Sequence, residues 1–264
     1  MQWVRIPGVI ALASALLATA CAVSRPGAPE REAVAALAPT GKLRVGVYTG
    51  SPTSYVPGQG NAAARGVAYE LGAKLAKAAN VPFEPVIFPS NDKVLEAMRA
   101  GSLDLVLTNA SAARAQFIDF SKPVLEVEKG YLIGPRSPVK GAADIDRAGV
   151  RIGVSRGSST EVELAQIIKS AMLVPMPSLA EARRALSEGG LDAFGTNKAI
   201  LFEMSDGIPG SRVIGNWGAE SIAFGVPKGR PAALAYLGRF VEDERRNGGV
   251  AAAAQRAGLR GLKQ

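Results

Sequence analysis

The chain repeats a pair of motifs in the same order in its two halves. RVGVYTGS at residues 44–51 is echoed by RIGVSRGS at 151–158, and AMRAGSLDLVLTN at 97–109 is echoed by ALSEGGLDAFGTN at 185–197. The first motif predicts an apolar strand that runs into a loop of Gly and Ser, and the second a helix that ends at Gly before a strand. Strand–turn–helix units are common, so the alternative explanation is a chance match. Both motifs occur in the same order in the two halves, however, which favours two lobes of similar construction.

Helices are expected between the repeated motifs. Apolar residues recur at helical spacing in VAYELGAKLAKAANV, DKVLEAMRAG, STEVELAQIIKSA and SLAEARRALSEGG. Strands that alternate with helices predict an α/β fold, with a mainly parallel sheet flanked by helices in each lobe. Ligands of such sheets bind beyond the carboxyl ends of the strands. The loops YTGS, LTNAS, SRGSS and GTNK all follow predicted strands, so we expect them to meet in a cleft between the lobes.

The chain is expected to cross between the lobes twice. GYLIGPRSP at residues 130–138 leads out of the first lobe and ESIAFGVPKG at 220–229 leads back. These crossovers predict that residues 41–131 and 222–264 form lobe 1 and that residues 132–221 form lobe 2. Two extended crossovers make a hinge, and a hinge permits closure around a ligand.

The N-terminus predicts export from the cytoplasm. Arg5 precedes an apolar run over residues 9–20 that is too short to span a bilayer but fits a signal peptide over residues 1–20. LATAC resembles the bacterial lipoprotein signal, in which the cysteine is acylated, although ATA also fits an ordinary cleavage site. Cys21 is the only cysteine and cannot form an internal disulfide, which favours a lipid anchor. Residues 21–40, rich in proline, predict a tether.

Composition excludes several kinds of site. The chain has no histidine, which excludes Ser-His-Asp triads, histidine general bases and His-ligated metals. No paired catalytic carboxylates stand out in the expected cleft loops, so we expect no enzyme, no cofactor and no metal. The formal net charge is +8, but the basic residues are scattered without interleaved aromatics. This pattern disfavours nucleic acid and leaves a membrane surface or an acidic ligand.

One arginine stands where a cation is unfavourable. LTNASAARAQFIDFS, residues 107–121, predicts a helix start with Ser111 as its N-cap and Arg114 in its first turn. The first turn carries free N–H groups and the positive end of the helix dipole, so it suits an anion. A bound carboxylate, held by Arg114, the free N–H groups and Ser111, would resolve the conflict. The alternative is a surface ion pair between Arg114 and Asp119.

A family resemblance follows from the order of the motifs. The motifs occur in this order along the chain: KLRVGV, GVAYELGAKLAK, LEAMRAGSLDLVL, an arginine before IDFSKP, YLIG, RIGVSRGSS, LDAFGTN and AFGVPKG. In this order they resemble bacterial extracellular solute-binding proteins of family 3. These are periplasmic components of ABC transporters for amino acids and similar small solutes. The resemblance runs from Gly41 nearly to the end. It implies a two-lobed periplasmic-binding-protein fold of type II with a two-strand hinge.

The resemblance also implies roles for single residues. Arg114 would hold the α-carboxylate of a ligand. Ser158 and Ser159 would correspond to a Gly-Thr loop that contacts the same carboxylate, with a plain helix cap as the alternative. Tyr48 and Tyr55 follow the first predicted strand, where the family places an aromatic that covers the ligand, with core packing as the alternative.

Two departures from the family pattern bear on the ligand. Asn197, preceded by Thr196, stands where amino-acid-binding members carry an aspartate for the ammonium group. An amide can bond an ammonium group but cannot neutralise it. Asn109, preceded by Thr108, is the repeat partner of Asn197, and the two could face each other as neutral polar groups. Arg156 is either a second anion contact or a solvated side chain.

These observations predict an extracytoplasmic solute-binding protein. We expect it to capture a small carboxylate-bearing solute, an amino acid or related organic anion, and to deliver it to an ABC transporter permease. Asparagine in place of the expected aspartate at position 197 favours a small organic anion, or a carboxylate with neutral hydrogen-bonding groups, over a standard α-amino acid. We expect a monomer in the periplasm or cell envelope, anchored through Cys21 if it is processed as a lipoprotein. The alternative is a ligand-sensing module that acts in trans on a membrane receptor or kinase.

Overall fold

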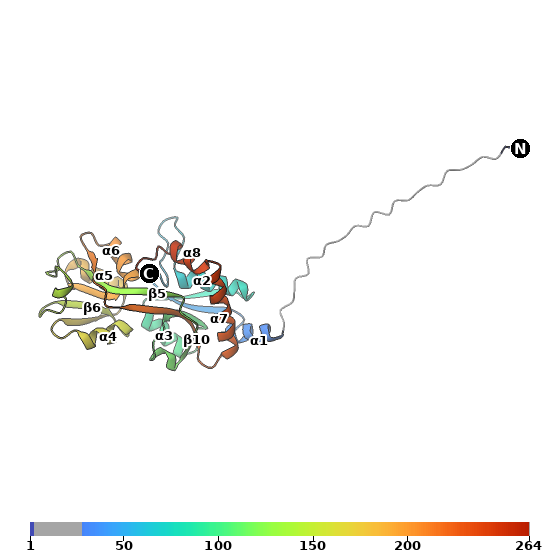
Figure 1. Ribbon diagram of the computed structural model, residues 1–264, viewed down its shortest axis with the longest axis horizontal. Coiled ribbons are helices and arrows are strands. Elements are labelled where there is room, and N and C mark those ends of the chain that lie inside the picture. Colours follow the sequence, from blue (N-terminus) through green and yellow to red (C-terminus); the bar gives the residue numbers. More distant parts are fainter. Residues whose placement is uncertain (3–27, 264) are drawn as a thin grey trace.

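The chain folds into two lobes joined by two long strands. The structure is a computed structural model that describes residues 1–2 and 28–263, so Cys21 and nearly all of the expected signal peptide lie outside the described residues. Figure 1 shows the joining strands, β5 (Leu125–Ile133) and β10 (Ala219–Pro227), side by side across the middle of the molecule. The α/β two-lobed fold is confirmed. The lobe boundaries at 131/132 and 221/222 stay a prediction, and both fall inside these strands.

Each lobe is built on a sheet of the same plan. In lobe 1 the strand order is β2-β1-β3-β10, with β4 paired to β10. In lobe 2 it is β7-β6-β8-β5, with β9 paired to β5. Three strands are parallel in each sheet, and the joining strand runs antiparallel to them. The bounds are β1 (Leu43–Tyr48), β2 (Phe83–Phe88), β3 (Leu105–Asn109), β4 (Ile118–Phe120), β6 (Arg151–Ser155), β7 (Met172–Met176), β8 (Ala193–Asn197) and β9 (Arg212–Ile214).

Helices cover both sheets, as the apolar spacing predicts. In lobe 2, Ser178 caps α5 by accepting a hydrogen bond from the Glu181 N–H at 3.2 Å, and Gly189 ends that helix with a left-handed φ of 80°. Helix α2 buries Leu71 and Leu75 against the sheet of lobe 1. The helices are α2 (Val67–Ala78), α3 (Asn91–Arg99), α4 (Ser159–Ile167), α5 (Leu179–Glu188), α6 (Lys198–Asp206), α7 (Pro231–Arg246) and α8 (Gly249–Arg256), with short 3₁₀ turns η1 (Arg114–Gln116) and η2 (Ala142–Asp144).

The repeat in the sequence reappears as one ion pair built twice. Arg44 at the start of β1 donates to both oxygens of Asp104, at 2.8 and 2.7 Å. Arg151 at the equivalent place in β6 donates to both oxygens of Asp192, at 2.9 and 3.0 Å. In both lobes the arginine backbone N–H also bonds the carboxylate. Because the guanidinium fork matches a carboxylate, each pair fixes the start of its central strand to the turn before the third strand.

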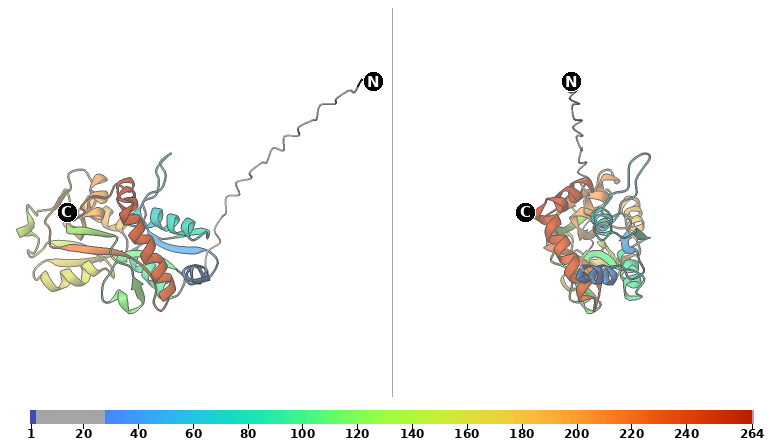
Figure 2. Two further views of the ribbon diagram at one scale, coloured as in Figure 1. Left: turned by 45° about the vertical axis from the view of Figure 1, so that its right-hand side comes forward. Right: turned by 90° about the vertical axis from the view of Figure 1, so that its right-hand side faces the viewer.

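The segment expected to be a tether is in part a helix. Residues Ala28–Leu37 form helix α1, which packs against α7, and Figure 2 shows the two side by side. Ala33, Leu37 and Ala38 are buried in the core of lobe 1. The prediction of a tether is therefore wrong from Ala28 to Ala38, because these apolar side chains find a surface on α7. No helix within residues 28–263 is long and apolar enough to cross a membrane.

Candidate ligand-binding site

A polar cavity lies between the lobes, at the carboxyl ends of β1, β3, β6 and β8. Its volume is about 50 Å³, which is room for a few water molecules. Asn109 of lobe 1 and Ser159 of lobe 2 are in hydrogen-bond contact beside this cavity, so a larger solute would need the lobes to move apart. The predicted residues that line the cavity are Tyr48, Thr108, Asn109, Arg114, Arg156, Ser158, Ser159, Thr196 and Asn197.

Arg114 is buried and has only neutral partners. Its side chain is 6% exposed. The guanidinium Nη1 donates to Thr108 Oγ1 at 2.9 Å and to the Asn109 carbonyl at 3.1 Å. Arg114 forms no ion pair with any described residue, and Asp119, the alternative partner, instead accepts a hydrogen bond from the Gly229 N–H at 2.9 Å. Burial lowers the pKa of Arg114, against the charge of Glu220, which raises it.

The helix start expected at Ser111 is a single 3₁₀ turn. The Ser111 carbonyl accepts hydrogen bonds from the N–H groups of Arg114 at 3.1 Å and Ala115 at 2.9 Å. These N–H groups are therefore not free for an anion, and a three-residue turn has little dipole. Ser111 lies in an outer groove beside the cavity rather than in it. The Arg114 side chain is therefore the group at this place that is suited to bind an anion.

Serine and asparagine side chains close the cavity from both lobes. Asn109 Nδ2 donates to Ser159 Oγ at 2.8 Å, which links β3 of lobe 1 to the start of α4 in lobe 2. Ser158 Oγ accepts the Glu161 N–H at 3.0 Å and caps α4, so the cap alternative holds for Ser158. Arg156 also lines the cavity, and its side chain is exposed.

The two candidate tyrosines separate in the structure. Tyr48, at the end of β1, lines the cavity and packs against apolar residues of both lobes. Burial raises its pKa. Tyr55 instead lies against Tyr69, with ring centroids 5.4 Å apart, and packs on the core of lobe 1. Tyr55 is therefore not among the residues that line this cavity, and its ring belongs to an aromatic cluster in lobe 1.

Asn197 is fully engaged by its own lobe and the hinge. Its Oδ1 accepts the Ile200 N–H at 3.2 Å and caps α6. Its Nδ2 donates to Glu220 Oε2 at 3.2 Å. Asn109 and Asn197 therefore do not form the expected pair of facing neutral amides. Each amide has a different partner, and the partner of Asn197 is an acid.

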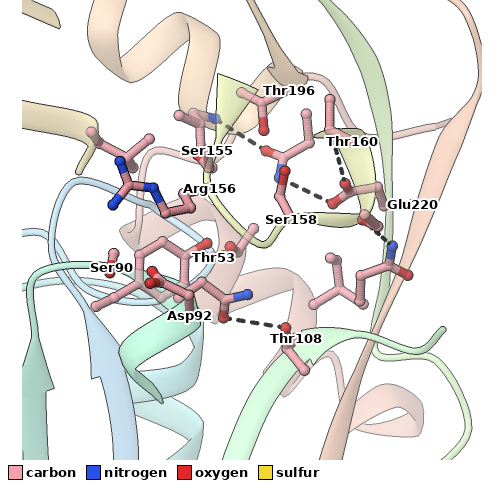
Figure 3. Close-up of a pocket in the computed structure, with 18 of the residues that line it drawn as sticks. Thr53, Ser90, Asp92, Thr108, Ser155, Arg156, Ser158, Thr160, Thr196 and Glu220 are labelled. Atoms are coloured by element: carbon pink, nitrogen blue, oxygen red, sulfur yellow. Dashed lines mark hydrogen bonds between the residues drawn. The ribbon is translucent and has the colours of Figure 1, made fainter. Parts of the chain in front are cut away.

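Glu220 is the site residue that the sequence did not reveal. It lies near the start of β10, is 7% exposed, and lines the cavity. Figure 3 shows its side chain entering the space between Thr160 and Thr108. Thr160 Oγ1 donates to Glu220 Oε1 at the long distance of 3.5 Å. The only signal in the sequence is an acidic residue at the head of an apolar hinge strand, ESIAFGVP.

Comparison with known proteins agrees with this fold. No curated protein matches the sequence. Among solved structures, the solute receptor for L-cysteine of Neisseria gonorrhoeae is 25% identical with a TM-score of 0.75 and covers 85% of this chain and 92% of its own. An amino acid ABC transporter substrate-binding protein from Streptococcus pneumoniae, bound to L-arginine, is 18% identical with a TM-score of 0.76. The match covers 84% of this chain and 96% of that protein. A histidine kinase sensor domain is 22% identical with a TM-score of 0.70, and the match covers 84% of this chain and 97% of that domain.

The family model for bacterial extracellular solute-binding proteins, family 3, matches residues 43–258. That range contains both sheets, the hinge strands and the cavity. The resemblance expected from the motifs is confirmed, and the chain belongs to family 3 of the bacterial extracellular solute-binding proteins.

Proposed function

We propose that the chain captures a small carboxylate-bearing solute between its lobes and delivers it to the permease of an ABC transporter. The observation that carries this proposal is the buried guanidinium of Arg114, which has only neutral acceptors. A buried cation without an anion is unfavourable. A solute carboxylate would offset that cost through charge-assisted hydrogen bonds, with Asn109 and Ser159 closing the lobes beside it.

Hydrogen bonds within lobe 1 alone orient the Arg114 guanidinium for this role. Thr108 and Asn109 belong to β3, and both bond the same Nη1 atom. The other guanidinium nitrogens are left to donate elsewhere, so the fork needs little reorganisation to meet a carboxylate. The solute would therefore bind lobe 1 first, and the contacts from Ser159 and Thr196 of lobe 2 would follow on closure.

Location and partner are part of the proposal. The family is extracellular, and the signal peptide predicted from the sequence supports a location outside the cytoplasm, in the periplasm or cell envelope. Acylation of Cys21 would anchor a monomer to the membrane near its permease. The transport role is supported by the fold shared with the L-cysteine receptor and the L-arginine-bound ABC transporter protein.

Sensing is the second candidate function. It is favoured by one observation, the fold shared with a histidine kinase sensor domain. In that case this chain would present its bound solute to a membrane receptor or kinase in trans. Cross-linking in intact cells separates the two functions, because transport predicts recovery of a permease and sensing predicts recovery of a kinase.

A ligand screen tests the binding proposal. Common L-amino acids and small organic acids are screened by thermal shift, and the best binder is titrated by calorimetry into the wild type and Arg114→Ala. We expect Arg114→Ala to weaken binding at least tenfold, because a hydrogen bond to a charged group contributes about 1.5–3 kcal/mol. Arg239→Ala, an exposed change on α7, is the matched control. Full affinity in Arg114→Ala would contradict the proposal.

A further inference from the structure

Two opposite charges face one cavity, and neither has an ionic partner. Arg114 is 6% exposed and Glu220 is 7% exposed, and both side chains line the cavity. Arg114 comes from lobe 1 and Glu220 from the hinge strand β10. No ion pair joins them to each other or to any other described residue. A site of this kind offers a cation at one place and an anion at another.

The neutral partners of Glu220 do not compensate its charge. Asn197 donates at 3.2 Å and Thr160 at 3.5 Å, and only the first is a well-formed hydrogen bond. Lys129 is the basic group nearest along the hinge, but it forms an ion pair with Glu163. A buried carboxylate in this setting is unfavourable until a cationic group reaches it.

Sheet register explains how the acid and the amide come together. Strand β5 runs between β10 and β8, with Glu220 opposite Val127 and Asn197 opposite Lys129. Val127 and Lys129 are two residues apart, so the side chains beside them lie on the same face of the sheet. Asn197 is therefore positioned to hold Glu220 toward the cavity while its other amide atom caps α6.

We propose that Glu220 recognises a protonated amine on the solute, and that the solute therefore carries an ammonium group as well as a carboxylate. This inference rests on the proposed function, because Arg114 takes the carboxylate. The acid that is missing at Asn197 is supplied by the hinge instead, and Asn197 is the positioning residue that orients it. Glu220 thereby distinguishes an amino acid from the same acid without its amine.

The test pairs each L-amino acid that binds with its desamino counterpart, the acid of the same carbon skeleton with hydrogen in place of the amine. In the wild type we expect the desamino acid to bind at least tenfold more weakly. In Glu220→Gln we expect the amino acid to lose at least tenfold in affinity, with the desamino acid unchanged or tighter. Equal binding of both acids by the wild type, or full amino acid affinity in Glu220→Gln, would overturn the inference.

Two further measurements separate the possible failures. Loss of binding in Arg114→Ala with no effect of Glu220→Gln would refute the ammonium site and leave the carboxylate site standing. Absence of binding by every carboxylate would refute the proposed function itself. Thermal unfolding shows whether Glu220→Gln is folded, and if it is not, the comparison of the two acids on the wild type still decides. Adding Asn197→Asp to Glu220→Gln returns an acid to the cavity and should restore the preference for the amino acid, whereas continued preference for the desamino acid would count against the inference.

Discussion

Glu220 is a buried acid, and its protonation should couple both stability and solute binding to pH. Burial raises the pKa of Glu220, against the hydrogen bond from Asn197 and the charges of Arg114 and Lys129, while Glu163 adds to the rise. The folded state therefore holds this proton more tightly than the unfolded state does. The stability of the ligand-free protein should fall as pH rises from the unfolded pKa of about 4.3 through the raised folded pKa.

We expect the pH dependence of ammonium binding to have the opposite sign. An ammonium group needs the ionised form of Glu220, so affinity should rise with pH, by up to about tenfold per unit, until Glu220 is ionised. Calorimetric titration and thermal unfolding between about pH 4 and 8 measure both slopes. Glu220→Gln should flatten both. Glu163→Gln, which alters a neighbouring acid outside the cavity lining, should keep the binding slope, and equal slopes in the wild type and Glu220→Gln would contradict the prediction.

Single residues of the site were predictable to different degrees. Arg114 stood out because a cation in that position needs an anion, although the helix that made it unfavourable is only a 3₁₀ turn. Asn197 stood out because an acid was expected there. Glu220 did not, because its place depends on the register of β10 on β5, and on a contact between residues 23 positions apart in the chain. Tyr55 lies outside the cavity lining, and the sequence around a loop tyrosine does not reveal whether the ring packs into the core.

At the scale of elements, local patterns predicted most of the fold. The repeated motifs mark β1 with β3 and β6 with β8, and the helices between them have clear apolar faces. Helix α1 was not predicted, because its few apolar residues form no strong pattern and its partner α7 lies nearly two hundred residues further along the chain. Its stability comes from tertiary packing rather than from its own sequence.

We expect α1 to be part of the folded domain and to contribute to its stability. Leu37 is fully buried in the core of lobe 1, while Glu32 on the same helix is exposed. Leu37→Ala should lower the free energy of unfolding by about 2–5 kcal/mol, because it removes buried methyl groups and leaves a cavity. Glu32→Ala should change it by no more than about 0.5 kcal/mol. Urea unfolding of the exported domain measures both, and equal stability of the two variants would show that α1 does not dock.

On the scale of the whole molecule, two ion pairs join residues of lobe 1 to helix α6 of lobe 2. Arg65, just before α2, donates to both oxygens of Glu203, at 2.7 and 2.8 Å. Arg260, near the C-terminus, donates to both oxygens of Asp206, at 3.1 and 2.5 Å. Both acids belong to α6. These two pairs lie at the rim of the closed lobes, apart from the cavity residues, so they hold the closed form without touching the solute.

Removing both acids should therefore shift the protein toward an open form. Ion pairs near the surface contribute about 0–1 kcal/mol each. The Arg65–Glu203 pair is half-buried and the Arg260–Asp206 pair is exposed, so Glu203→Gln with Asp206→Asn should weaken solute binding by up to about thirtyfold. The radius of gyration of the ligand-free variant, measured by small-angle X-ray scattering, should exceed that of the wild type, and saturating solute should bring the two together. Glu244→Gln is the matched control, because Glu244 pairs with Lys74 at 2.8 Å within lobe 1. An unchanged radius and unchanged affinity in the double variant would show that closure depends on the cavity contacts alone, with Asn109 and Ser159 as the link between the lobes.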